Sequence, residues 1–237
     1  MITLLDANSC EFPDPYHASD DMGLLAFGGD LSAERLVSAY RQGIFPWFSL
    51  QDPIMWFSPN PRALITPNQL HVSKSMARFL RQHSYDVRWN TAFAQTMSLC
   101  AAPRAGQSGT WILPCMQQAY LELHQMGVAH SIEIWHDQVQ IGGLYGVCLG
   151  PFFFGESMFS HQKNASKLAL ISLVQRLASQ GLVFLDCQIM TDHLQSLGAQ
   201  AYDRALFLSW LPLELEKPEY QAVSNSVVNR YLATREC

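Results

Sequence analysis

Three polar side chains occur within otherwise apolar segments of the later part of this chain. Glu156 stands at the exit of an apolar run, while Asp186 and Gln188 belong to the short apolar segment Leu182–Gln188. Side chains alternate along a strand, so Asp186 and Gln188 should share one face and Cys187 should lie on the other. Polar groups on an apolar strand cost free energy unless they are paired or used. The sequence therefore predicts an acidic and polar site at this strand.

Two other kinds of chemistry fit the same stretch less well. Ser157, Asp186 and His193 follow the chain order of an α/β-hydrolase, but the residues around Ser157 lack the second glycine of the nucleophile elbow. A coenzyme A acetyltransferase would hold pyrophosphate on a glycine-rich loop. No glycine lies between Gly155 and Gly181, so the acetyl-CoA interpretation is weakened as well.

A predicted helix carries three basic residues, Lys74, Arg78 and Arg81, within an arc of roughly 60° on one face. Apolar residues occupy the opposite face, and no acid separates the three. Two interpretations stay open, a solvated surface and a phosphate-binding surface. Three contacts to phosphates of one strand would give a salt dependence with a slope of about −2.

The composition suits one large or two modest soluble domains. The chain has 237 residues, of which 49% are hydrophobic and 15% are charged. No apolar run is long enough to span a bilayer, and the N-terminus lacks the basic and apolar regions of a secretory signal. We therefore expect a cytoplasmic protein with no membrane partner. The net charge of −5 argues mildly against nucleic acid, although a local basic face can still bind phosphate.

The cysteines and histidines indicate neither disulfides nor a metal. Six cysteines lie far apart without a Cys-x-x-Cys pair, so we expect reduced thiols that are mostly buried. Eight histidines show no metal-binding spacing. We expect no metal and no cofactor.

The elements that must position these residues follow from periodicity and from turn residues. Ser32 is the expected N-cap of a helix over Ala33–Gln42, with Gly43 after its end. The proline-rich Pro59–Pro61 suggests a domain boundary, which gives domains 1–60 and 61–237. The larger domain is predicted to contain five helices, four strands and one hairpin turn. The helices are Ser73–His83, Ala92–Cys100, Pro114–Met126, Ser166–Gln180 and a short one that ends near Leu197; the strands are Ser131–Trp135, Val139–Leu149, Phe152–Gly155 and Leu182–Gln188; and the turn is His136–Gln138. Antiparallel strands followed by a β-α-β crossover predict a three-layer α/β sandwich.

Many short blocks of this sequence, in one order and spacing, resemble the leucyl/phenylalanyl-tRNA–protein transferase family over nearly the whole chain. The blocks are LLAFGGDLSAERLVSAYRQGIFPWF, SPNPRA, SGTWI, HSIEIW, GGLYGV, GESMFS, NASK, DCQ and DH-LQSLGA. The resemblance implies an aminoacyltransferase that moves Leu, Phe or Met from aminoacyl-tRNA onto proteins beginning with Arg or Lys. Such tagging leads to degradation by the N-end rule. It also implies an α/β (α+β) fold, with a small N-terminal domain joined to a mixed-sheet domain that is like the N-acetyltransferase (GNAT) fold but lacks coenzyme A.

The same resemblance assigns roles to residues of this chain. Asp186 and Gln188 match the proposed catalytic pair, and Glu156 matches an acidic position near the acceptor. The positions that match the donor site and the tRNA-facing cluster are Trp47, Trp111 and Tyr120 around the aminoacyl-adenosine; Leu144, Phe153, Met158 and Leu170 in its apolar pocket; and Lys74, Arg78 and Arg81 on the side of the tRNA. Tyr120 also fits a plain core face together with Met116 and Leu123.

Some positions depart from the family pattern. Leu144 stands where a Met is familiar, Phe57 replaces a Trp, and residues 161–163 differ as well. These departures concern the shape of the pocket and leave the expected reaction unchanged. A monomer is expected. A second hypothesis, from another class, is a tRNA-binding or peptide-binding module without catalysis.

Overall fold

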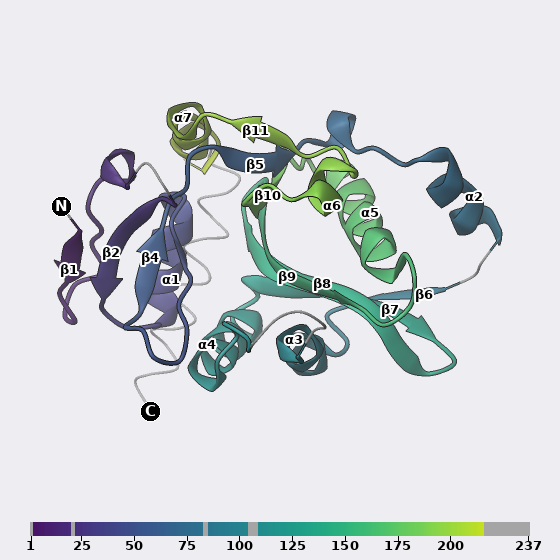
Figure 1. Cartoon of the computed structure of the whole chain (residues 1–237), viewed down its shortest axis with the longest axis horizontal. Helices are drawn as coiled ribbons and strands as arrows, with labels where there is room; N and C mark the ends of the chain where they lie inside the picture. Colours follow the sequence, from purple (N-terminus) through teal and green to yellow (C-terminus); the bar gives the residue numbers. More distant parts are fainter. Residues whose placement is uncertain (1, 20–21, 83–84, 104–108, 216–237) are drawn as a thin grey trace. The chain divides into compact units, whose positions relative to one another are not determined.

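The strands that the structure describes form two separate sheets. The computed structural model describes residues 2–19, 22–82, 85–103 and 109–215 (Figure 1). A four-stranded sheet has the order β1-β2-β4-β3, and a seven-stranded sheet has the order β11-β5-β10-β9-β8-β7-β6. The strands of the smaller sheet are β1 (Thr3–Leu5), β2 (Leu24–Gly28), β3 (Phe45–Pro46) and β4 (Met55–Phe57). The strands of the larger sheet are β5 (Arg62–Ile65), β6 (Asp86–Trp89), β7 (Ala129–His136), β8 (Val139–Leu149), β9 (Phe152–Ser160), β10 (Phe184–Gln188) and β11 (Gln200–Tyr202).

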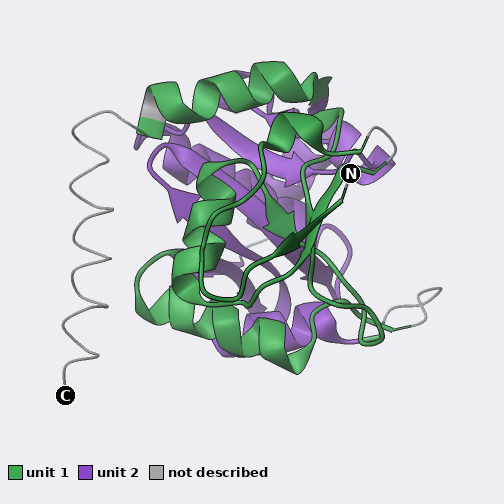
Figure 2. Ribbon diagram, turned by 90° about the vertical axis from the view of Figure 1, so that its left-hand side faces the viewer, with its two compact units in different colours: residues 1–62, 103–128, 201–237 green, residues 63–102, 129–200 purple. Residues whose placement is uncertain are grey.

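The chain divides into two compact units, which are coloured separately in Figure 2. Unit 1 consists of residues 1–62, 103–128 and 201–237, and unit 2 consists of residues 63–102 and 129–200. The chain first leaves unit 1 after residue 62, close to the boundary predicted after residue 60. It then returns to unit 1 twice, so two later segments join the N-terminal stretch.

The described residues of unit 1 form three α-helices, α1 (Ala33–Arg41), α4 (Pro114–Gln125) and α7 (Arg204–Leu215). The Ser32 hydroxyl caps α1 by accepting from the Arg35 amide, and Gly43 follows the helix with a φ of 70°. Both predicted boundary residues of this helix are therefore confirmed. Helix α1 packs on α4 and α7. A Cβ on Gly43 would lie 2.6 Å from the ring of Phe207 in α7, so only glycine permits this close approach.

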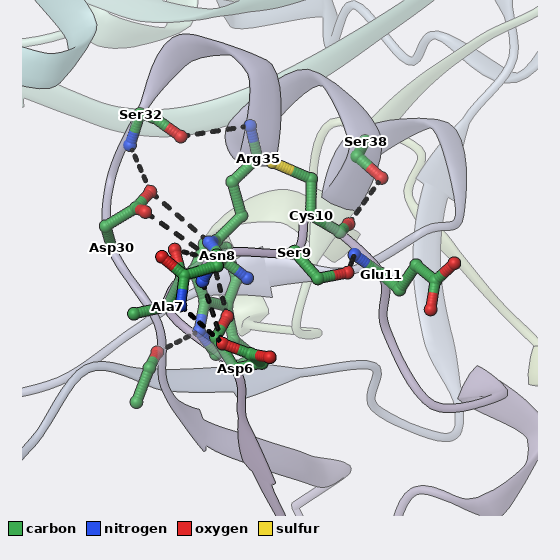
Figure 3. Close-up of polar contacts among 12 residues, drawn as sticks. Asp6, Ala7, Asn8, Ser9, Cys10, Glu11, Asp30, Ser32, Arg35 and Ser38 are labelled. Carbon is green, nitrogen blue, oxygen red and sulfur yellow. Dashed lines mark hydrogen bonds and ion pairs between the residues drawn. The ribbon is translucent and has the colours of Figure 1, made fainter.

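Two buried arginines hold unit 1 together through backbone carbonyls. Arg35 donates to the carbonyl of Asp6 at 2.9 Å and to the side chain of Asp30 at 3.2 Å, which ties the segment after β1 to the start of α1 (Figure 3). Arg204, at the start of α7, donates to the carbonyls of Ser58 at 2.8 Å and Ala18 at 3.2 Å. A buried guanidinium needs such partners because an unpaired buried charge is costly.

The larger sheet contains the predicted meander and crossover. Strands β7, β8 and β9 pair antiparallel, and the β7–β8 turn has positive φ at Asp137 and Gln138, as a type I′ hairpin requires. Helix α5 (Ala165–Ala178) then connects β9 to the parallel strand β10. The predicted hairpin turn and β-α-β crossover are confirmed.

Helices of unit 2 cover both faces of its sheet. Helices α2 (Lys74–Gln82) and α5 lie on one face with the short α6 (Asp192–Gln195), and α3 (Phe93–Ala101) lies on the other (Figure 1). This arrangement gives the predicted three-layer α/β architecture with a mixed sheet. One apolar cluster fills the space under α2 and α5; its members include Met76, Ile132, Leu144, Phe153, Leu168, Leu170, Leu173 and Leu185.

Several expectations need correction. The cysteines are not mostly buried: among the five in the described ranges only Cys100 is buried, and Cys115 is exposed. Strand β9 continues to Ser160, so Glu156 lies inside the strand and not at its exit. His83 and Cys237 lie outside the described residues. In the described ranges no three His, Cys, Asp or Glu side chains gather as metal ligands would. No helix there has the length and hydropathy to cross a bilayer.

Candidate active site

Asp186 is fully buried on β10 and shapes the end of that strand. Its Oδ1 accepts a hydrogen bond from the backbone N–H of Gln188 at 2.8 Å. Gln188 has a φ of 64°, in the left-handed region that residues other than glycine seldom adopt. A short side chain that accepts from the backbone two residues ahead stabilises such a turn. Asp186 therefore fixes the backbone on which Gln188 is presented.

Each of the two neighbouring strands contains a β-bulge at this point. In β9, Gly155 and Ser157 face consecutive residues of β8, so Glu156 is the extra residue. In β10, Cys187 is the extra residue opposite β5. The parallel β9–β10 ladder ends at the pair Phe154 and Asp186. Bulges often redirect a side chain next to a site, and here they occur on both strands beside the candidate residues.

The two bulges are accompanied by a contact between Glu156 and Gln188. The Gln188 side-chain amide donates from Nε2 to Oε1 of Glu156 at 2.8 Å. Because the NH₂ group faces the carboxylate, the amide oxygen of Gln188 is directed elsewhere. The alternation predicted for this strand holds for Cys187, which packs on the apolar cluster with Leu185. It ends at the bulge, so Gln188 is placed by its turn and by Glu156 and not by simple alternation.

The four residues predicted for an apolar pocket lie together between the sheet and α5. Leu144, Phe153 and Leu170 are buried members of the apolar cluster, and the partly buried Met158 packs against it. Leu144 on β8 and Met158 on β9 are directly opposed. The structure thus brings these side chains into one cluster, and their role as a pocket stays a prediction.

A glycine of β8 allows the aromatic residues of β9 to pack closely. A Cβ on Gly146 would lie 2.5 Å from the ring of Phe153 and 2.2 Å from the Phe154 carbonyl. The Phe153 ring therefore covers the backbone of β8 where any side chain would displace it. The Gly-Gly-x-x-Gly spacing in this strand was a signal for such close packing, since glycine inside a strand marks close approach.

The three remaining donor-site residues belong to unit 1. Tyr120 on α4 is fully buried, and its hydroxyl is hydrogen-bonded to the hydroxyl of Tyr40 on α1. Trp47 is partly buried and packs edge-on against Phe57, with ring centroids 5.6 Å apart. Trp111 is partly buried. The core interpretation of Tyr120 is confirmed, whereas the donor-site role of all three stays a prediction. Sequence reasoning missed Tyr40, which no local pattern links to Tyr120.

The predicted basic helix has the expected two faces. Met76 of α2 is buried in the apolar cluster, while Lys74, Arg78 and Arg81 are all exposed. The cationic face is therefore available to a partner.

Two ionisable side chains of unit 2, His193 and Cys148, have shifted pKa values. Burial lowers the pKa of the His193 imidazole on α6, and the positive charge of Lys167 lowers it further. Cys148 is partly buried as a residue, and removal of its thiol from water raises the pKa of that thiol to about 11. A thiol with that pKa stays protonated and inert near neutral pH.

Comparison with known sequences identifies the class of enzyme. Residues 64–212 match the model of a family described as leucyl/phenylalanyl-tRNA protein transferase, and residues 29–60 match the model of its N-terminal domain. The chain therefore belongs to the leucyl/phenylalanyl-tRNA–protein transferase family of aminoacyltransferases. The two matches lie on either side of the predicted boundary, and the division into 1–60 and 61–237 stays a prediction.

Individual relatives are similar over most of their length. A leucyl/phenylalanyl-tRNA–protein transferase of Pseudomonas fluorescens strain Pf-5 is 51% identical over 219 residues, which cover 92% of this chain and 97% of that one. The protein of the same name from Azotobacter vinelandii is 50% identical, with the same shares of both chains covered.

Solved structures are more distant. A C-terminal domain of a lysylphosphatidylglycerol synthetase from Agrobacterium fabrum aligns with 72% of this chain and 56% of its own, at 13% identity and a TM-score of 0.40. A GCN5-related N-acetyltransferase from Kribbella flavida aligns with 70% of this chain and 60% of its own, at 11% identity and a TM-score of 0.34.

Proposed function

We propose that this enzyme transfers Leu, Phe or Met from aminoacyl-tRNA to the N-terminal α-amino group of proteins that begin with Arg or Lys. The product enters degradation by the N-end rule, and the enzyme acts in the cytoplasm as a monomer. The observation that carries the proposal is the arrangement of Asp186, Gln188 and Glu156 at the two bulges, within a chain about half identical to enzymes of this name.

The reaction needs orientation more than strong acid–base catalysis. The amine nitrogen bonds to the ester carbonyl carbon, the ester C–O bond breaks, and the proton lost by the amine ends on the released ribose hydroxyl. An α-amino group titrates near pH 7.7–8.0, so roughly a tenth of it is neutral at pH 7. Good orientation of two reactants is worth about 7–11 kcal/mol. A rigid hydrogen-bonding site therefore suffices.

Gln188 is the group that orients the amine. Its NH₂ is held by Glu156, so its amide oxygen is left to accept a hydrogen bond from the attacking amine. Asp186 holds the backbone of Gln188 through its N–H and assists departure of the proton. The buried position of Asp186 makes this carboxylate a fixed part of the site.

Acceptor choice follows from the same carboxylates. Glu156 and Asp186 provide negative charge next to Gln188, and they attract the basic side chain of an N-terminal Arg or Lys. Attraction between opposite charges is strengthened where water is partly excluded. Glu156, which is partly exposed, is the better placed of the two to meet an incoming side chain.

Donor choice follows from an apolar pocket formed by Leu144, Phe153, Met158 and Leu170. One methylene in such a pocket discriminates by only about 1–3 kcal/mol, so Leu, Phe and Met are all accepted while charged side chains are excluded. Trp47, Trp111 and Tyr120 hold the aminoacyl-adenosine, and Lys74, Arg78 and Arg81 bind phosphates of the tRNA.

The test is transfer of labelled leucine from Leu-tRNA to a peptide beginning with Arg. A matched peptide with acetylated Arg is the control, because it lacks the nucleophile. Transfer to the free amine alone is expected. No transfer to either, while the tRNA ester survives, would favour the non-catalytic tRNA- or peptide-binding module. Loss of transfer in Asp186→Ala with tRNA binding retained would exclude that module.

A further inference from the structure

Helices α2 and α5 form a cationic layer on one face of the sheet of unit 2. Their segments, KSMARFLRQ and ASKLALISLVQRLA, contain no acidic residue. They carry Lys74, Arg78, Arg81, Lys167 and Arg176, a third of the fifteen Lys and Arg in a chain whose net charge is −5. Such segregation of positive charge on an acidic protein is the electrostatic footprint expected of a polyanion-binding surface.

Both helices lie on the same side of the sheet. The apolar faces of α2 and α5 pack into one cluster, with Met76 from α2 and Leu168 and Leu170 from α5. Figure 1 shows the two helices on that face. The outer surfaces of α2 and α5 therefore lie on the same side of the sheet. Lys167 and Arg176 are nine positions apart, which places them on opposite flanks of α5. Positive charge therefore extends from α2 onto both flanks of α5.

The two cations of α5 are available for contact. Arg176 is exposed, and its guanidinium lies 4.3 Å from the ring centroid of Trp89, which holds it in place. Lys167 is partly exposed. Neither residue is in an ion pair with any residue that the structure describes. Two cations without carboxylate partners in the described part of the chain suit an external anion.

Lys167 lies in the first turn of α5, the helix that follows β9, the strand of Glu156. Its positive charge lowers the pKa of the His193 imidazole on α6. Helix α6 begins at Asp192, four residues after Gln188 at the end of β10. Asp192 is the one described acid on α6, and Thr191 caps the helix. In the view of Figure 1, α5 is drawn between the basic helix α2 and β10, the strand that carries the candidate catalytic pair.

We propose that the phosphate backbone of the tRNA runs over α5 as well as α2, with Lys167 and Arg176 as additional phosphate contacts. The proposal rests on the proposed function, because it assumes a tRNA-bound donor. The path connects the basic helix to the site where the aminoacyl ester must lie. Lys167 and Arg176 each meet one phosphate.

The experiment measures the Kd of deacylated leucine tRNA at several salt concentrations for wild type and the Lys167→Gln/Arg176→Gln double variant. Each lost phosphate contact should reduce the steepness of log Kd against log salt by about 0.7–0.9. The double variant should therefore lose about 1.5 from the slope, and its Kd should rise on the order of tenfold at 0.15 M salt.

Arg88→Gln is the matched control. Arg88 lies on β6, in an ion pair with Asp86 at 2.6 Å, and its guanidinium is 4.6 Å from the ring centroid of Trp135. This substitution changes net charge by the same amount per residue as each test substitution. It should leave the tRNA slope unchanged. Thermal unfolding of every variant checks that each is folded.

Two results would overturn the proposal. One is an unchanged Kd and slope in the folded double variant. The other is a loss in Arg88→Gln that is half the loss in the double variant, since a pure effect of net charge would scale with the number of charges removed. The proposal would also be overturned if the double variant kept its affinity for tRNA but lost binding to anionic phospholipid vesicles. The cationic layer would then be a membrane-binding surface. Transfer of leucine by the wild type is measured in parallel. If the wild type transfers leucine, a negative binding result counts against this proposal and leaves the proposed function intact.

Discussion

Gln188 and Glu156 are joined by a hydrogen bond of 2.8 Å between two neighbouring strands, and the β-bulges of these strands lie at Glu156 itself and at Cys187 beside Gln188. The bond fixes which end of the Gln188 amide faces the carboxylate. It also makes the two residues interdependent, so a change in either should alter what the other presents.

Replacement of Asp186 should separate its structural role from its charge. Asp186→Asn keeps an oxygen that accepts from the Gln188 N–H, so the fold should persist while transfer falls about 10²-fold. Asp186→Ala removes the acceptor as well and should lower the free energy of unfolding by about 1–3 kcal/mol. Urea denaturation and leucine transfer measure both effects. Full turnover with an unchanged pH profile in Asp186→Asn would show that the assignment is wrong.

Glu156→Gln tests whether this carboxylate attracts the acceptor. The variant retains an oxygen for the Gln188 amide but loses the charge, so kcat should change little while KM for a peptide beginning with Arg rises roughly tenfold. A peptide beginning with citrulline, the uncharged analogue of Arg, is the control, and its KM should not respond. Equal effects on both peptides would contradict an electrostatic role.

Leu144→Met should change the ranking of the amino-acid donors. Met is more flexible than Leu, and it would soften the wall of the predicted pocket opposite Met158. We expect the ratio of kcat/KM for Phe and Leu donors to shift by about threefold or more. Leu173→Met, in the same apolar cluster but outside the predicted pocket, is the control. An identical ranking in Leu144→Met would count against the pocket.

The hydroxyl pair of Tyr40 and Tyr120 should couple α1 to α4. Each Tyr→Phe substitution disrupts the hydrogen bond between two buried hydroxyls and should cost about 1–2 kcal/mol of unfolding free energy. Because both substitutions break the same bond, the double variant should cost less than the sum of the two. Urea denaturation of the four proteins measures the coupling. Strict additivity would mean that the two hydroxyls act independently.

The pKa of His193 should respond to Lys167. Burial and the Lys167 charge both lower this pKa in the folded state, so the unfolded chain binds the proton more readily. Stability from this group is therefore full above its ordinary pKa near 6.5 and is lost as the pH falls from there toward the lower folded value. Lys167→Gln should raise the pKa of His193, which NMR titration measures. Lys163→Gln is the control for general charge, and an equal rise in both would refute proximity.

Local signals in the sequence predicted much of the fold. Ser32 and Gly43 predicted the limits of α1, because an N-cap hydroxyl and a left-handed glycine act within a few residues. The spacing of apolar residues predicted α5 and the crossover to β10. The smaller sheet was not predicted, since its strands have only two to five residues and lie in turn-rich sequence.

The candidate site was predicted in its composition but not in its geometry. Glu156, Asp186 and Gln188 were identified because polar residues stand out in apolar strands. Their arrangement depends on one extra residue in each strand, and alternation gives no signal for an extra residue. The hydrogen bond between Tyr40 and Tyr120 could not be predicted from sequence patterns either, because the two residues are 80 positions apart.

The position of Arg204 affects the order in which the protein completes its fold. Its guanidinium binds the carbonyls of Ser58 and Ala18, and α7 behind it supplies the ring that packs on Gly43. The ribosome releases these three partners long before it adds residue 204. The N-terminal stretch is therefore synthesised first but becomes complete last. A growing chain must keep the surface that α7 will cover from binding elsewhere until nearly the whole sequence has been made.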